Sequence, residues 1–233
     1  YSAFQNFAHY WRYRFGAGNM MIKGTFESSL LLILLLGFCA IHCDTLLGRE
    51  VRLVDYSKID THAKYAPKSA EANIEGLVDY LIKPARNDRE KLRAVFTWIT
   101  HNISYNTALL SNPTKARALS AQAVLRSKSS VCSGYSNLAK TMMTLALKRE
   151  VYRVNGLAKG YGYKDGKLGS HAWIAVELDG NWYFIDCTWG AGYLDDTGRF
   201  KRSFNDYYFL IAPEVLKYTH LPEDPSWQKI HDP

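Results

Sequence analysis

The segment that decides the fold is residues 171–188, whose sequence is HAWIAVELDGNWYFIDCT. Two runs of aromatic and β-branched residues flank the dipeptide Asp179-Gly180. An Asp-Gly pair between such runs is among the strongest signals for a β-hairpin with a two-residue turn. We therefore predict two antiparallel strands, over His171–Leu178 and Trp182–Thr188.

The length of the turn also decides which side chains share a face of the hairpin. In a two-residue turn Leu178 pairs with Asn181, which places Trp173 opposite Asp186. Because side chains alternate, one face is apolar and is predicted to be core: Ala172, Ile174, Val176, Leu178, Tyr183, Ile185 and Cys187. The other face carries His171, Trp173, Trp182, Phe184 and Asp186. On it His171 and Asp186 are diagonal neighbours, close enough for the carboxylate to hold an imidazole nitrogen. A three-residue loop would reverse this assignment.

Helical periodicity dominates the chain before the hairpin. Ser69 is predicted to cap a helix that ends at Pro84, with one apolar face made of Ile74, Leu77, Val78, Leu81 and Ile82. Asp88 is predicted to cap a second helix, which Asn102 closes.

Further elements follow on both sides of the hairpin. We predict a short helix capped by Ser120, a longer helix over Cys132–Lys148 and a strand over Val151–Ala158. Beyond the hairpin we expect a short strand from Tyr207 and a helical turn opened by Pro213. Helices first and antiparallel strands second predict an α+β domain.

A candidate nucleophile stands at the start of the longer helix. A helix N-terminus favours the thiolate of Cys132 through its dipole and free N–H groups, which can also stabilise an oxyanion. His171 would exchange protons with the thiol and the leaving group, while Asp186 fixes its tautomer and orientation. Each residue alone is more simply explained as a core cysteine, a surface or core histidine and a turn former. Their combination predicts a Cys–His–Asp catalytic centre.

Three blocks of the sequence resemble the Cys, His and Asp blocks of the transglutaminase-like superfamily: VCSGY at 131–135, HAW at 171–173 and WYFIDCTWG at 182–190. The tail resembles the kyphoscoliosis-peptidase and hillarin branch more narrowly, through FLIAPE at 209–214 and THLPEDPSWQ at 219–228. With the helix end WITHNISY at 98–105, the resemblance covers about 70–228.

This resemblance implies a papain-like cysteine-protease fold, with N-terminal helices packed on an antiparallel sheet. It implies acyl transfer on peptide or side-chain amides, with Cys132, His171 and Asp186 as the triad. Ser130 departs from the pattern, since these sequences usually have Gly before the Val-Cys pair. A second oxyanion donor is not identified. The candidates, Trp98 and Gln122, are more simply explained by helix packing and by an exposed polar position.

Composition and spacing restrict other functions. With 233 residues and 47% hydrophobic composition, the chain has room for one sizeable core. Its net charge of +7 comes from scattered residues and is a weak indication of acidic partners. The cysteines and histidines lack zinc-site spacing, and Asp195-Asp196 near Asp206 lacks the form of a calcium loop. We expect a protein or peptide substrate, no nucleic acid, no metal and no cofactor. The oligomeric state is not indicated.

The N-terminal part is predicted to be a targeting segment. An apolar run over 28–41 follows Lys23 and precedes polar sequence, which is the order of a secretory signal peptide. We expect secretion without a membrane span after cleavage. The alternative is an uncleaved anchor, which about 14 apolar residues would support only marginally. The predicted divisions are an upstream extension of unclear origin (1–19), a signal peptide (20–43), an N-terminal arm (44–68), a transglutaminase-like domain (69–228) and a truncated tail (229–233).

Two hypotheses compete with a thiol enzyme acting as peptidase, amidase or transglutaminase. One is a catalytically silent binding or scaffolding module, since a fold does not guarantee activity. The other is redox control through a Cys132–Cys187 disulfide, which the register opposes because Cys187 lies on the face away from Asp186. The remaining cysteines, Cys39 and Cys43, lie in or beside the signal peptide, so a disulfide scaffold is not indicated.

Overall fold

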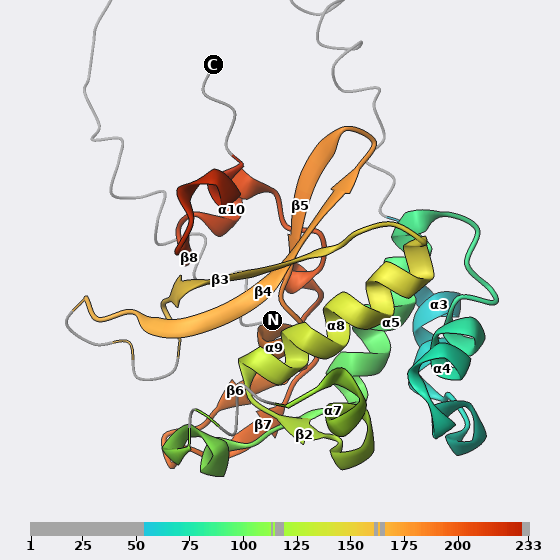
Figure 1. Ribbon diagram of the computed structural model, residues 1–233, viewed down its shortest axis with the longest axis horizontal. Coiled ribbons are helices and arrows are strands. Elements are labelled where there is room, and N and C mark those ends of the chain that lie inside the picture. Colours follow the sequence, from blue (N-terminus) through green and yellow to red (C-terminus); the bar gives the residue numbers. More distant parts are fainter. Residues whose placement is uncertain (1–53, 113, 115–118, 161–162, 164–165, 230–233) are drawn as a thin grey trace, which may run out of the picture. The chain divides into compact units, whose positions relative to one another are not determined.

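The centre of the fold is a four-stranded antiparallel sheet built on the predicted hairpin (Figure 1). The computed structural model describes residues 54–229 except 113, 115–118, 161–162 and 164–165. The strand order is β5-β4-β3-β8. The bounds are β3 (Tyr152–Ala158), β4 (Gly169–Leu178), β5 (Asn181–Ile185) and β8 (His220–Pro222). Strand β3 is the one predicted before the hairpin, whereas β8 is not among the predicted strands.

The register of the hairpin is the predicted one. Leu178 pairs with Asn181, and Ile174 pairs with Ile185. The φ angles of the turn are 54° at Asp179 and 75° at Gly180. Positive φ at both central residues is what a type I′ turn requires, and Asp-Gly supplies it at low cost.

Strand β5 is shorter than predicted because the chain turns into a helix after Ile185. Asp186 caps α9 (Cys187–Ala191): its Oδ1 accepts hydrogen bonds from the backbone N–H groups of Thr188 at 2.8 Å and Trp189 at 3.1 Å. A carboxylate that accepts from the amides of the next turn favours a helix start at that point. The predicted strand end at Thr188 is therefore wrong.

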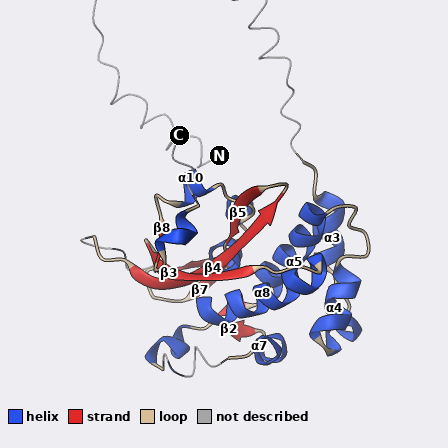
Figure 2. Cartoon of the chain, turned by 45° about the horizontal axis from the view of Figure 1, so that its top comes forward, coloured by secondary structure: helices blue, strands red, loops and turns tan. Residues whose placement is uncertain are grey.

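The larger helices lie on one side of the sheet, and a short one, α10 (Pro213–Leu216), lies on the other (Figure 2). The bounds of the larger helices are α3 (Ser57–Lys64), α4 (Ile74–Leu81), α5 (Asp88–Asn102), α7 (Ala121–Ser127) and α8 (Cys132–Leu147). Helix α8 contacts both β4 and α5, so it connects the sheet to the helical layer. The predicted Ser120 cap of α7 is confirmed.

The apolar face of the hairpin packs against these helices, as predicted. Its contribution to the main core consists of Ile174, Val176, Leu178 and Ile185, and Cys187 joins them as the first residue of α9. The helices contribute large buried side chains, among them Phe96, Trp98, Leu138 and Met142. Burial of a side chain of this kind stabilises the folded state by about 1.5–3 kcal/mol. The hairpin and α8 are therefore held together chiefly by apolar burial.

Two helix caps differ from the prediction. The side chain of Asn73 caps α4, whereas Ser69 lies within a 3₁₀ helix, η1 (Lys68–Ala72). The side chain of Asn87 caps α5, and Asp88 is the first residue of that helix. Asn, Asp and Ser are nearly equivalent as caps, so a sequence pattern does not separate adjacent candidates.

Short elements complete the loops around the sheet. Strand β1 (Ser104–Tyr105) pairs in parallel with β2 (Ser129–Ser130), and β6 (Gly192–Leu194) pairs antiparallel with β7 (Phe200–Arg202). A 3₁₀ helix, η2 (Thr107–Ser111), follows β1. Strands of two or three residues have no periodicity that a sequence pattern could detect.

The second face of the hairpin is buried as well. Trp173 and Phe184 pack with Ile211 and Leu216 in a separate, smaller core. The alternation of apolar residues in the hairpin does not predict that this second face is covered, because the covering residues, Ile211 and Leu216, come from a distant segment of the chain. The face predicted to carry the reactive groups is therefore enclosed by the tail.

That tail folds back over the sheet from residue 206 onward. The helical turn predicted at Pro213 is α10, but Tyr207 lies in a 3₁₀ helix, η3 (Asp206–Tyr208), and not in the predicted strand. Strand β8 then pairs with β3. The last described element, η4 (Pro225–Gln228), places the Trp227 ring 5.5 Å from that of Trp182.

Part of the predicted N-terminal arm is helical. Asp60 of α3 accepts two hydrogen bonds of 2.7 Å from the buried Arg93 of α5, and this ion pair docks α3 on the core. Residues 1–53, which include the predicted signal peptide, lie outside the described residues. Among the residues described, no helix is both long and apolar enough to cross a bilayer.

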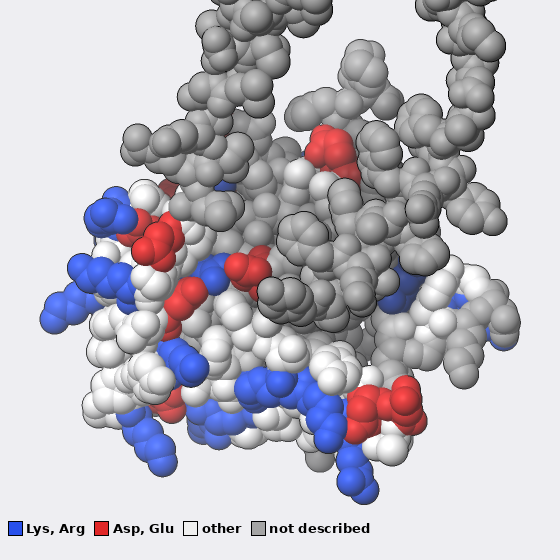
Figure 3. All heavy atoms as spheres, turned by 180° about the vertical axis from the view of Figure 1, so that it is seen from behind, with Lys and Arg blue, Asp and Glu red and all other residues white. Residues whose placement is uncertain are grey.

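Charged side chains of both signs lie on the face opposite to that of Figure 1. Lys and Arg gather along the lower part of this face, with Asp and Glu beside and above them (Figure 3). The chain as a whole has a net charge of +7. The positive charge of this face is therefore partly offset by neighbouring carboxylates.

Gly134, in the first turn of α8, allows a stability prediction. A Cβ at this position would collide with Ser130 Oγ and lie 2.9 Å from Val124 Cγ2. Ala normally stabilises a helix relative to Gly, but here we expect Gly134→Ala to lower the free energy of unfolding by about 1–3 kcal/mol through overpacking. The double variant Ser130→Gly/Gly134→Ala should recover most of the loss in denaturant unfolding. A Gly134→Ala protein as stable as the wild type would contradict this packing.

Candidate active site

Cys132 is the first residue of α8, as predicted. Val131 precedes it and makes no side-chain cap hydrogen bond, and the first N–H groups of a helix have no partner within the helix. Strand β2 leads into this point, and the carbonyl of its Ser130 accepts a hydrogen bond of 2.8 Å from Asn106 N–H. The thiol is therefore held on a fixed backbone beside helix N–H groups.

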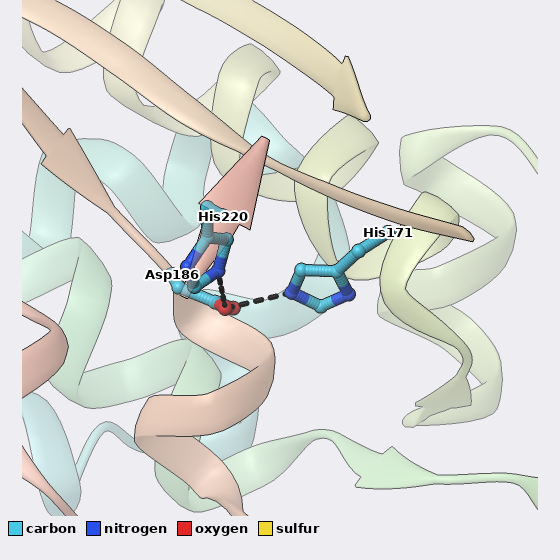
Figure 4. A group of neighbouring side chains, drawn as sticks. All are labelled: His171, Asp186 and His220. Atoms are coloured by element: carbon cyan, nitrogen blue, oxygen red, sulfur yellow. Dashed lines mark hydrogen bonds and ion pairs between the residues drawn. The ribbon is translucent and has the colours of Figure 1, made fainter. Parts of the chain in front are cut away.

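His171 and Asp186 hydrogen-bond directly (Figure 4). The distance between His171 Nε2 and Asp186 Oδ2 is 2.7 Å. His171 is 8% exposed and Asp186 is 1% exposed, so the bond is largely shielded from water. The contact predicted from the register of the hairpin is present.

At both His171 and Asp186, charge and hydrogen bonding together shift the pKa more than burial does. Burial by itself lowers the pKa of His171, but the charge and hydrogen bond of Asp186 raise it above the usual range, and a hydrogen bond with Cys132 acts in the same direction. Burial by itself raises the pKa of Asp186, yet the charge and hydrogen bond of His171 hold it well below its usual value. Asp186 is therefore ionised, and the protonated form of His171 is favoured beside the Cys132 thiol.

A third polar side chain, His220 of β8, lies at this site and was missed by sequence reasoning. Its Nε2 is 3.2 Å from Asp186 Oδ2, and it is 2% exposed. The ligand atoms of His171, Asp186 and His220 lie within 4.8 Å of one another, so the group is of a kind that can hold a metal ion. In the structure the Nε2 atoms of both histidines hydrogen-bond Asp186 Oδ2. No regular sequence spacing links His220 to His171 and Asp186. The only sequence feature that could have indicated it is the motif THLPEDPSWQ at 219–228, which contains it.

Aromatic rings enclose the two imidazoles. Trp189 and Trp173 stack on His171 with ring centroids at 5.2 and 6.1 Å. Trp189 also lies 4.6 Å from His220. These rings limit the rotation of both imidazoles and exclude water from the Asp186 carboxylate.

Two cavities meet at His171. The larger has a volume of about 900 Å³ and is lined by Cys132 and His171 together with residues of η2, β3 and β8. The smaller, of about 630 Å³, is lined by His171 and Trp189 but not by Cys132. Tyr105 lines both cavities. A substrate could therefore reach the thiol from one side while a second molecule reaches the imidazole from the other.

Residues 75–187 match the family model of the transglutaminase-like superfamily. The chain carries a domain of this superfamily. The domain has the predicted papain-like α+β fold, with helices packed on an antiparallel sheet. Human kyphoscoliosis peptidase is 33% identical over 194 residues, which cover 81% of this chain and 29% of the relative. Hillarin of Drosophila melanogaster is 26% identical, covering 77% of this chain and 24% of the relative.

These relatives confirm the resemblance to the kyphoscoliosis-peptidase and hillarin branch. The chain spans less than a third of the length of either protein. Among solved structures, the crystal structure of a TGase has a TM-score of 0.36 and 16% identity, covering 75% of this chain and 42% of that chain.

Neither suggested oxyanion donor of the transglutaminase-like domain lines the two cavities at His171. Trp98 is fully buried, with the ammonium group of Lys128 4.2 Å from its ring, and Gln122 lies on α7. Tyr105 lines both cavities, and its hydroxyl makes no hydrogen bond to the described part of the chain. Burial raises the pKa of Tyr105, and the charges of Cys132 and Asp186 raise it further. Its hydroxyl therefore remains a proton donor.

The second cysteine of the transglutaminase-like domain is separate from the site. Cys187, the first residue of α9, is buried in the main core, as the register predicts, and burial raises its pKa. Both Cys132 and Cys187 are free thiols. This arrangement opposes the hypothesis of a disulfide between them.

Alkylation by iodoacetamide tests the pairing of Cys132 with His171. Since the thiolate is the reactive form, we expect His171→Ala to slow the reaction of Cys132 roughly tenfold or more. Cys187 is the internal control and should stay unmodified in the folded protein, because it is buried. Peptide mapping after timed labelling measures both sites. An identical rate profile in wild type and His171→Ala would show that the imidazole does not activate the thiol.

Proposed function

We propose that this domain catalyses thiol-dependent acyl transfer on peptide or side-chain amides through Cys132, His171 and Asp186. The observation that carries the proposal is the buried 2.7 Å hydrogen bond between His171 and Asp186, with His171 lining the same cavity as the Cys132 thiol at the start of α8. A nucleophile, a base that touches it and a third group that orients the base are the parts of a catalytic triad.

In the proposed first step, the Cys132 thiolate attacks the amide carbonyl carbon and forms a C–S bond. The N–H groups at the start of α8 would stabilise the resulting oxyanion. When the intermediate collapses, the C–N bond breaks, and His171 gives its proton to the departing amine. Asp186 stays ionised throughout and holds the imidazole in one orientation. The products of this step are a thioester on Cys132 and a free amine.

In the second step, the proposed acceptor is water. Neutral His171 takes a proton from the water as it attacks the thioester carbonyl, and the C–S bond breaks to release a carboxylic acid and the Cys132 thiolate, with His171 again protonated. The smaller cavity reaches His171 without including Cys132, which suits delivery of an acceptor to the base. Hydrolysis is also consistent with the name of the relative kyphoscoliosis peptidase. A primary amine in place of water would give transglutamination.

The larger cavity suits a peptide with apolar side chains. Leu109, Leu110, Leu157 and Leu221 line it beside Cys132. Three of them, Leu110, Leu157 and Leu221, are 51%, 42% and 46% exposed. A bound apolar side chain would remove this exposed area from water. We infer that the substrate carries an apolar residue close to the reacting amide.

A peptide library assayed with and without a primary amine tests the proposed function. We expect release of a carboxylic acid product, enrichment of peptides with apolar residues near the reacting amide, and loss of turnover in Cys132→Ala. The matched control Cys187→Ala should keep its turnover, because that thiol lies in the core. A folded wild-type protein that turns over no peptide under either condition would favour a silent binding module instead.

A second prediction concerns Tyr105 as an oxyanion donor. We expect Tyr105→Phe to lower kcat by about 10²-fold, the usual effect of removing one such donor. The Phe ring should keep the packing beside Tyr135, whose centroid is 6.4 Å away, so thermal stability should change little. Steady-state kinetics and a thermal melt measure the two effects. An unchanged kcat would exclude Tyr105 from this role.

A further inference from the structure

The carboxylate of Asp186 has more partners than a catalytic triad requires. Its Oδ1 accepts from the backbone N–H groups of Thr188 and Trp189, at 2.8 and 3.1 Å. Its Oδ2 accepts from His171 at 2.7 Å and from His220 at 3.2 Å. The second imidazole therefore shares one oxygen atom with the catalytic imidazole (Figure 4).

The hydrogen bonds of His220 define its tautomer. An ionised carboxylate can only accept, so the Nε2 atom of His220 carries a proton. The other ring nitrogen, Nδ1, is 2.8 Å from the hydroxyl oxygen of Thr219. Burial lowers the pKa of His220, against the opposing effect of Asp186, so the ring is neutral. Its Nδ1 atom then accepts a hydrogen bond from the Thr219 hydroxyl.

The backbone around His220 is fixed against the sheet. Leu221 and Pro222 of β8 pass over Gly156 of β3, where a Cβ would collide with Leu221 O and lie 2.8 Å from Pro222 Cα. Thr219 O accepts from Lys159 N–H at 3.0 Å. The close approach needs a glycine in β3, and it brings the His220 ring to the Asp186 carboxylate.

His220 comes from a part of the chain that the family match does not include. The match ends at residue 187, whereas β8 begins at His220. The tail that carries β8 also covers Trp173 and Phe184 in the smaller core. This segment therefore supplies both a cover for the site and a polar contact within it.

We propose that His220 is a positioning residue, which acts through Asp186 to fix the orientation of the His171 imidazole. With two amides on Oδ1 and His220 on Oδ2, the carboxylate cannot rotate about its Cβ–Cγ bond without losing hydrogen bonds. Its remaining acceptor capacity is directed at His171 Nε2, which leaves Nδ1 of His171 for the proposed proton exchange with the thiol. The kinetic part of this inference rests on the proposed function, and the geometric part does not.

Two substitutions of His220 distinguish a role as hydrogen-bond donor from a role in packing alone. His220→Gln can keep an N–H group near the position of Nε2, whereas His220→Leu keeps apolar volume and removes the donor. We expect kcat to fall about 10- to 100-fold in His220→Leu, with KM nearly unchanged. His220→Gln should retain most of the wild-type kcat. A matched control is His62→Leu, since His62 bonds the carbonyl of Tyr80 at 2.8 Å, outside the site.

Nuclear magnetic resonance with ¹⁵N-labelled histidine gives a readout that needs no substrate. At neutral pH we expect His220 to be protonated at Nε2 and unprotonated at Nδ1. In His220→Leu, the Nε2 proton of His171 should exchange with water faster than in the wild type, and in His220→Gln it should stay protected. Packing alone would not distinguish the two variants in this way.

The outcomes separate this inference from the proposed function. A wild-type protein that turns over no amide, but shows the expected tautomer and exchange pattern, would leave the placement of His220 supported and the proposed function without support. An active wild type with an equally active His220→Leu variant would overturn the role of His220 alone. His220 found unprotonated at Nε2, or a Gln variant as impaired as the Leu variant, would also overturn it.

Discussion

The buried carboxylate of Asp186 is the constraint on which the site and much of the fold depend. A charge that is 1% exposed is stable only when its oxygens are paired, since an unpartnered buried charge costs several kcal/mol. Its four donors come from three separate segments: the start of α9, the His171 end of β4, and His220 of β8. Hairpin register, helix start and the return of the tail therefore meet at a single side chain.

The same carboxylate connects structure to chemistry. Because Asp186 is ionised, it favours the protonated form of His171 in an environment that would otherwise favour the neutral ring. Trp173 and Trp189 keep that ring in place and water away from it. The main core fixes the other partner, since α8 packs on the sheet and begins at Cys132. The thiol and the imidazole are thus positioned by two rigid elements.

The parts of the fold that sequence predicts are those set by local rules. Asp179-Gly180 determines the turn, the turn determines the register, and alternation then assigns Cys187 to the core and Asp186 to the site. His220 follows no such rule, because its contact with Asp186 joins a three-residue strand to a hairpin far away in the chain. The position of Tyr105 likewise depends on a two-residue strand pairing. Long-range contacts of short elements leave no periodic pattern in the sequence.

The charge of Asp186 can be measured directly. In a ¹³C-labelled aspartate titration, assigned by comparison with Asp186→Asn, the Asp186 carboxyl should remain ionised well below the ordinary aspartate pKa of about 3.9. Because pairing lowers the pKa of Asp186 in the folded state, it stabilises the fold at pH values above the ordinary aspartate pKa. This stabilisation is lost as the pH falls through the lowered pKa. An Asp186 carboxyl that is protonated at neutral pH, or titrates at the ordinary value, would contradict an ionised carboxylate as the organising group.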